Sequence, residues 1–293
     1  MLRPSTIPPE RPVDPLTVEV LRMVVDCAGR LEVPIFVAGA MARDIVLYHL
    51  HGFDPERATS DLDFAVMVSN WSQFDRLKAT LTAAGRFTES NAEQQSLLFD
   101  GVYPVDLVPF GEVAGATSVV AWPPHLHTVM NVMGYEEALE HALHVEVAHG
   151  LVVPVCSMAS LAALKLFAWL DRRSETRKDA LDFSLLLRRY GEVLGDRLYE
   201  GTVLEAVGYD RERAGARLLG QHAQAVLRTN ATESLLAVLN DARERDALTV
   251  QIAAGLSHFE EPVDVAALWL EDFRLGLAEP SGSVRAGEES TAS

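Results

Sequence analysis

The stretch Thr59-Ser60-Asp61-Leu62-Asp63-Phe64-Ala65-Val66 decides the fold expected for this chain. Its apolar residues predict a strand over residues 62–68. Because side chains alternate between the two faces of a strand, Asp61 and Asp63 share one face, while Leu62 and Phe64 point into the core. Two neighbouring carboxylates repel each other, and a divalent cation is the usual reason for placing them together. A solvated strand face is the competing interpretation.

Two further segments favour the cation. The run VPIFVAG (residues 33–39) predicts a buried strand that ends in Gly39 and leads into a helix over residues 40–51, whose first N–H groups favour anions. The run YPVDLVPFG (residues 103–111) places Asp106 in an apolar strand, where a carboxylate is costly unless it is paired or binds a metal. Three strand carboxylates near a glycine turn therefore indicate a two-metal site for phosphoryl-type transfer.

In their order, these segments resemble the DNA polymerase β-type nucleotidyltransferase superfamily and, within it, the AbiEii-like nucleotidyltransferase toxins of type IV toxin–antitoxin systems. The resemblance spans roughly residues 33–190. It rests on four blocks: Gly39-Ala40-Met41-Ala42-Arg43-Asp44, Ser60 to Asp63, VDLVPFG at 105–111, and K-L-x-A-W-x-D-R followed by K-D-A-x-D between Lys165 and Asp182. The chain departs from the family pattern in one place, because Ala40 stands where a serine usually follows the glycine.

The resemblance implies a role for each block. Asp61, Asp63 and Asp106 would hold two Mg²⁺ ions, for which Mn²⁺ can substitute, and these ions would bridge an NTP. Asp106 would also orient or deprotonate the attacking hydroxyl group. The phosphate contacts would come from Gly39, Ala40 and Ser60. The implied fold is α+β: a small mixed β-sheet nucleotidyltransferase domain with flanking helices, followed by an all-helical C-terminal bundle.

The helical half supplies cations. Lys165 lies in the apolar run LAALKLFAW (residues 161–169), so it must reach an anion or extend to water. The resemblance makes it a catalytic and nucleotide-binding residue, and it gives nucleotide-binding roles also to Arg43, Arg172, Lys178 and Asp182. It further suggests that Asp179 or Asp182 orients Lys165 or an arginine. Structural pairing is the competing interpretation: Lys178 and Asp182 stand at i, i+4 on a predicted helix and Arg43 adjoins Asp44.

The pattern changes near residue 156 and predicts four regions. These are an extended, proline-rich leader (1–14), the catalytic domain (15–156), a helical domain (157–273) and a disordered tail (274–293). Hairpin turns are expected at Asp100-Gly101 and His149-Gly150. Helices are expected over 158–171, and over 176–190 with Gly191 as the stop.

Composition excludes several classes of protein. The 293 residues carry a net charge of −17, which excludes a generic nucleic-acid coat protein because phosphate binding needs a basic surface. The two cysteines fit no metal motif, and no apolar run approaches the roughly 20 residues that span a bilayer. His125 and His127 form an H-x-H pair without a third ligand at a suitable spacing. We therefore expect a cytoplasmic protein with no membrane partner and no zinc.

The sequence thus predicts an enzyme that moves a nucleoside monophosphate from an NTP to an acceptor hydroxyl and releases pyrophosphate. Its active site is expected in the cleft between the two domains. By the resemblance, the acceptor is RNA, such as a tRNA 3′ end, the outcome is growth inhibition, and a cognate antitoxin is the protein partner. A small-molecule nucleotidyltransferase of the aminoglycoside type stays open, since the negative charge favours a cationic acceptor. A non-catalytic nucleotide-binding module is the third interpretation.

Overall fold

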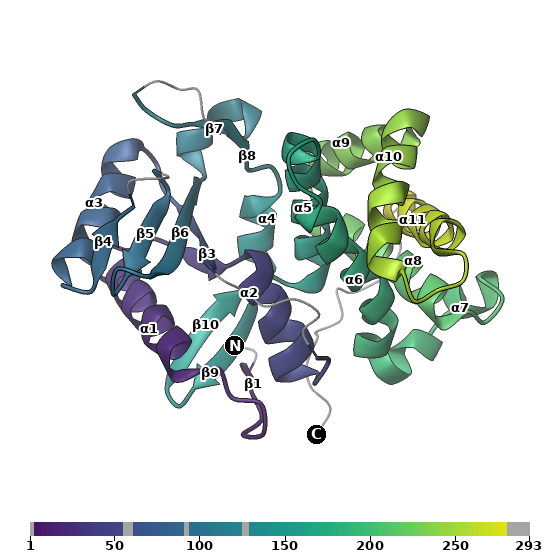
Figure 1. The fold of residues 1–293 in the computed structure, drawn as a ribbon, viewed down its shortest axis with the longest axis horizontal. Coiled ribbons are helices and arrows are strands. Elements are labelled where there is room, and N and C mark those ends of the chain that lie inside the picture. The colour runs from purple at the N-terminus through teal and green to yellow at the C-terminus, as the bar shows by residue number, and fades with distance from the viewer. Residues whose placement is uncertain (1–2, 55–60, 91–93, 125–128, 280–293) are drawn as a thin grey trace. The chain divides into compact units, whose positions relative to one another are not determined.

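The computed structural model describes residues 3–54, 61–90, 94–124 and 129–279. The chain divides after Ser157 into two compact units. Figure 1 shows that the first contains a mixed sheet with helices and that the second is helical. The predicted fold class, a mixed-sheet domain with flanking helices followed by a helical bundle, is therefore confirmed.

A mixed β-sheet forms the centre of the first unit. Within the described residues it has eight strands in the order β1-β9-β10-β2-β3-β6-β5-β4. The pairs β1–β9, β10–β2 and β3–β6 are parallel and the other neighbours are antiparallel. The strands are β1 (Ser5–Thr6), β2 (Ile35–Val37), β3 (Leu62–Met67), β4 (Phe87–Glu89), β5 (Ser96–Phe99), β6 (Tyr103–Phe110), β9 (Leu143–Ala148) and β10 (Leu151–Val155). A separate small sheet pairs β7 (Val119–Ala121) with β8 (Val129–Asn131).

The helices of the first unit begin at recognisable caps. The side chain of Asp14 accepts a hydrogen bond from the backbone of Thr17 at the start of α1 (Pro15–Arg30), and Asn70 caps α3 (Trp71–Ala83) in the same way. The helix predicted after Gly39 is present as α2 (Gly39–Asp44), which continues as a π-helical segment over Ile45–Leu50. A 3₁₀ segment (Glu112–Thr117) and α4 (Tyr135–Glu140) complete the set.

The leader predicted over 1–14 is attached to the domain. Its strand β1 extends the sheet edge beside β9. Arg11 donates hydrogen bonds from its guanidinium group to the backbone oxygens of His49 (3.2 Å) and Leu50 (2.9 Å). These contacts hold the described part of the segment, residues 3–14, against the domain.

Helices account for almost all of the second unit. They are α5 (Met158–Arg172), α6 (Lys178–Leu194), α7 (Val203–Ala206), α8 (Arg211–Val226), α9 (Thr229–Asn240), α10 (Ala242–Ala253) and α11 (Pro262–Ala278), with 3₁₀ segments at Gly195–Tyr199 and Ala254–Leu256. Among the described helices, none combines the length and the apolar character that crossing a membrane requires.

Two boundaries in this unit differ from the prediction. Helix α6 does not end at Gly191 but continues to Leu194. Gly191 instead permits the close approach of α6 and α8. A Cβ on Gly215 of α8 would lie 2.6 Å from the backbone nitrogen of Gly191. Helix α11 reaches Ala278, past the predicted end at residue 273, and Leu277 is fully buried. Residues 280–293 of the predicted tail lie outside the described residues, as do His125 and His127.

Candidate active site

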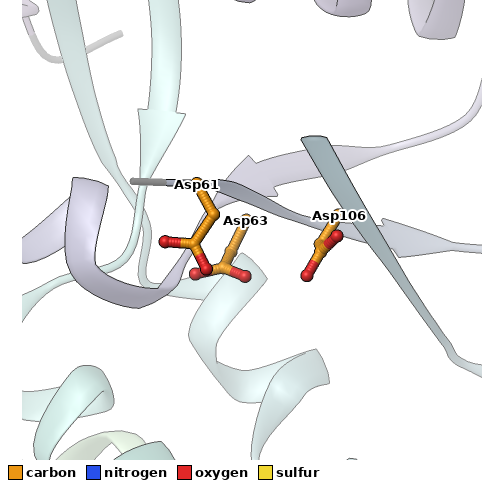
Figure 2. A group of neighbouring side chains, drawn as sticks. All are labelled: Asp61, Asp63 and Asp106. Carbon is orange, nitrogen blue, oxygen red and sulfur yellow. The ribbon is translucent and has the colours of Figure 1, made fainter. Parts of the chain in front are cut away.

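Three aspartates meet on one face of the sheet. Strands β3 and β6 are parallel neighbours, and Asp63 stands opposite Asp106 in their register. Asp61, just before β3, shares this face because it precedes Asp63 by two residues. One carboxylate oxygen of each residue lies within 4.8 Å of those of the other two. Figure 2 shows the carboxylates of Asp61 and Asp63 side by side, with that of Asp106 opposite them.

This arrangement fits a divalent cation. Two unit negative charges within 4.8 Å of each other repel by at least about 3.5 kcal/mol at an effective dielectric constant of about 20. Each of the three side chains is only partly buried, so the site is open to water and to a ligand. Carboxylate oxygens are the ligands that Mg²⁺ and Mn²⁺ prefer. The donor set and the charge therefore both suit such an ion.

A glycine makes room for the second carboxylate. Gly39 opens α2 with φ at +60°, a conformation that glycine adopts readily. A Cβ at this position would lie 1.8 Å from Oδ2 of Asp63, far inside van der Waals contact. The backbone N–H of Ala38 also donates to the backbone oxygen of Asp63 at 2.8 Å. The start of α2 is thus held directly against one member of the carboxylate triad.

The other residues predicted near the phosphates have varied positions. Ala40 is buried as the second residue of α2. Arg43 is also buried, and it binds the carboxylate of Asp44 through Nε at 2.8 Å and Nη2 at 2.7 Å. Of the two interpretations offered for Arg43, the structure displays the pairing with Asp44. Ser60 lies outside the described residues.

One contact of the triad was not predicted. The hydroxyl of Ser96, on β5, donates a hydrogen bond to Oδ1 of Asp106. Ser96 stands directly opposite Asp106 across the antiparallel β5–β6 pair. Counting outward from a two-residue turn at Asp100-Gly101 would place Ser96 opposite Val105. The connection has three residues, so Phe99 stands opposite Tyr103 and Ser96 opposite Asp106, which the predicted turn alone did not reveal.

The second unit contains a buried ion cluster. Nζ of Lys165 lies 2.7 Å from Oδ2 of Asp182 and 3.3 Å from Oδ1 of Asp179. Arg172 donates hydrogen bonds to the carboxylate of Asp179 from both Nε (2.6 Å) and Nη2 (2.9 Å). Asp182 is therefore the partner of Lys165 and not of Lys178, which is exposed at the first turn of α6.

The environment of Asp179 favours its charged form. Burial by itself raises the pKa of this carboxyl, but the hydrogen bonds from Arg172 and the positive charge of Lys165 outweigh it. The pKa of Asp179 therefore lies below its ordinary value. Both acids of the cluster are buried, and each lies within ion-pair distance of a cation.

Comparison with known proteins identifies a family. The family model described as "Nucleotidyl transferase AbiEii toxin, Type IV TA system" matches residues 31–275. No curated protein matches the chain.

Solved structures give only remote likenesses. The antibiotic-resistance factor ANT(2″)-Ia is 14% identical, with a TM-score of 0.34, over 59% of this chain and 83% of its own. A CCA-adding enzyme with CTP is 14% identical, with a TM-score of 0.29, over 87% of this chain and 64% of its own. The Thermotoga maritima CCA-adding enzyme complexed with tRNA is 14% identical, with a TM-score of 0.26, over 92% of this chain and 80% of its own.

Proposed function

This chain belongs to the AbiEii nucleotidyltransferase toxin family of type IV toxin–antitoxin systems, and from that premise we propose that it transfers a nucleoside monophosphate from an NTP to RNA. The acceptor that we propose is the hydroxyl at a tRNA 3′ end, with release of pyrophosphate and arrest of growth. Membership of the family makes the chain a nucleotidyltransferase. The observation that carries the metal-dependent mechanism is the approach of three carboxylate oxygens to within 4.8 Å of one another beside Gly39.

In this mechanism each residue of the site has a task. Asp61, Asp63 and Asp106 would hold two Mg²⁺ ions, and these ions would supply the positive charge that neutralises the triphosphate and the charge that develops during transfer. Asp106 also orients the attacking hydroxyl and accepts its proton. The backbone N–H groups of Gly39 and Ala40 contact the phosphates, because they lie at the start of a helix and favour anions.

On the family resemblance alone, we assign Lys165 to nucleotide binding. Asp179 and Asp182 fix the position of its ammonium group, and Arg172 holds Asp179 in place. Lys165 then acts as a hydrogen-bond donor of defined position. Lys178, which is exposed at the start of α6, is assigned to the nucleotide on the same basis.

Two aspartate substitutions test the proposal. With total tRNA and each of the four α-³²P-labelled NTPs, the wild type should label RNA, while Asp63→Ala and Asp61→Asn should lose at least about a hundredfold in rate, since each removes a metal ligand. The exposed Glu89 of β4 supplies the control, and Glu89→Gln should label RNA like the wild type. Circular dichroism checks that all variants fold. Unchanged labelling by both aspartate variants would refute the mechanism.

A small-molecule acceptor is the second candidate. The net charge of −17 favours a cationic acceptor such as an aminoglycoside. The same labelled NTPs offered with an aminoglycoside panel separate the two candidates. Label on an aminoglycoside and none on tRNA overturns the RNA proposal. NTP binding without label on either acceptor indicates a non-catalytic module.

The toxin role has its own test. Induced expression of the wild type should arrest growth, and Asp63→Ala should not. Because NTPs and tRNA are found in the cytoplasm, we propose that the protein acts there. A cognate antitoxin is the proposed protein partner, and a basic surface on it would complement the acidic charge of this chain.

A further inference from the structure

We propose that Ser96 is a positioning residue of the metal site, and that its hydroxyl orients the carboxylate of Asp106 for cation binding. The proposal rests on the proposed function in one respect, because it takes Asp61, Asp63 and Asp106 as ligands of a divalent cation.

The sheet register places Asp106 between its two polar neighbours. On one side, Asp106 stands opposite Asp63 in the parallel β3–β6 pair. On the other side, it stands opposite Ser96 in the antiparallel β5–β6 pair. Residues directly opposite on one face of an antiparallel pair have Cβ atoms about 4.5–5.5 Å apart, which a short side chain such as serine can bridge. The three residues therefore form one row across three adjacent strands.

The contact fixes the orientation of the carboxylate. Ser96 donates its hydroxyl proton to Oδ1 of Asp106, and a hydrogen bond to a carboxylate is stronger than one between neutral groups. Rotation of the carboxylate about its Cβ–Cγ bond would break this bond. One oxygen of Asp106 is thereby kept within 4.8 Å of the oxygens of Asp61 and Asp63.

The backbone around Ser96 is also fixed. The N–H of Leu107 donates to the backbone oxygen of Gln95 at 3.0 Å, and the N–H of Ser90 donates to that of Ser96 at 3.2 Å. Ser96 itself is only 8% exposed. A buried hydroxyl held by a rigid strand loses little further freedom when it binds the carboxylate, so it is well suited to hold a metal ligand in place.

The composition of β5 argues against a purely structural role. The strand reads Ser96-Leu97-Leu98-Phe99, and its other residues are apolar. An apolar side chain at residue 96 would fill the same space and continue the pattern. The single hydroxyl stands at the one position of β5 that faces Asp106. Groups that orient metal ligands in this way typically contribute 10- to 100-fold to metal affinity or activity.

Metal binding by the nucleotide-free protein tests the proposal. The free Mn²⁺ signal in electron paramagnetic resonance gives the affinity of the wild type, Ser96→Ala and Ser96→Thr. We expect Ser96→Ala to bind Mn²⁺ at least about tenfold more weakly. Ser96→Thr should match the wild type, because it keeps a hydroxyl on the same carbon. Ser184→Ala is the matched control, since Ser184 is a buried serine of α6 in the second unit, and its affinity should not change.

A reference variant, Asp106→Asn, separates the possible failures. If Asp106→Asn loses Mn²⁺ while Ser96→Ala binds it like the wild type, the role of Ser96 is refuted. Ser96→Thr binding as weakly as Ser96→Ala refutes it too, because packing and not the hydroxyl is then responsible. A wild type that binds no Mn²⁺ refutes the metal site and the role of Ser96 together.

Two further results complete the design. If Mn²⁺ binding depends on Asp106 but no acceptor is ever labelled, the transfer reaction is refuted and the Ser96 comparison is still decided. Melting curves recorded in EDTA check the fold of each variant. Should Ser96→Ala not fold, Ser96→Cys replaces it, because its thiol is a similar size and a much weaker donor.

Discussion

Substitution of Gly39 by alanine is expected to disable the site while leaving the protein folded. The new Cβ would lie 1.8 Å from Oδ2 and 2.6 Å from Cγ of Asp63. Ordinary contacts are about 3.5 Å, so the carboxylate or the start of α2 must move by about 1.7 Å. A displacement of about 1 Å costs roughly a hundredfold in catalysis. We therefore expect Gly39→Ala to lower labelling of tRNA at least about a hundredfold and Mn²⁺ affinity at least about tenfold.

The same substitution has a calculable effect on stability. Alanine at a φ of +60° costs about 1–2 kcal/mol, and overpacking against Asp63 adds about 1–3 kcal/mol. Gly150→Ala is the matched control: its φ is +69° and, apart from its chain neighbours, no described atom lies within 4 Å of the new Cβ. In urea denaturation, Gly150→Ala should lose only the backbone cost of about 1–2 kcal/mol, and it should label tRNA like the wild type. Wild-type labelling by Gly39→Ala would show that the position of Asp63 does not matter, and the reasoning would fail.

Two further predictions concern the second unit. Lys165→Met leaves the carboxylates of Asp179 and Asp182 buried without their shared cation. Urea denaturation should therefore show that the free energy of unfolding falls by about 3–5 kcal/mol, and the double variant Lys165→Met/Asp182→Leu should recover much of this loss. A double variant as unstable as Lys165→Met would contradict the prediction. Burial, and to a lesser degree Arg197, lowers the pKa of His222 to about 4 from 6.5. The unfolded chain therefore binds the extra proton first, and stability should fall by about 3 kcal/mol as the pH drops from 6.5 to 4. His222→Gln should remove that part of the pH dependence. An unchanged slope of the free energy of unfolding against pH would contradict the assignment to His222.

The meeting of the three aspartates could be predicted because strand geometry is local. Alternation puts Asp61 and Asp63 on one face whatever the rest of the chain does. An acid in the middle of an apolar strand, as at Asp106, needs a partner, and the neighbouring strand is the nearest source of one. The glycine turn before α2 is likewise a local signal, since a positive φ favours glycine.

Features that depend on contacts distant in sequence were harder to predict. A glycine such as Gly191 typically ends a helix, but here it packs against Gly215, and the two glycines permit α6 and α8 to approach closely. The spacing of Lys178 and Asp182 suits a surface pair, yet Asp182 is buried and binds Lys165 from a different helix. In both cases a tertiary contact overrides a local rule.

The charges of the two clusters explain why divalent cations are central to the proposed reaction. An anionic triphosphate cannot approach Asp61, Asp63 and Asp106 unless positive charge lies between them, because each pair of like charges at such distances repels by several kcal/mol. The ion cluster of the second unit provides no such charge, since Lys165 and Arg172 are balanced by Asp179 and Asp182. The rest of the chain is strongly acidic. In the proposed reaction, bound metal ions would supply positive charge directly beside the three carboxylates, so we expect nucleotide affinity to depend on Mg²⁺ more steeply than on any single lysine or arginine.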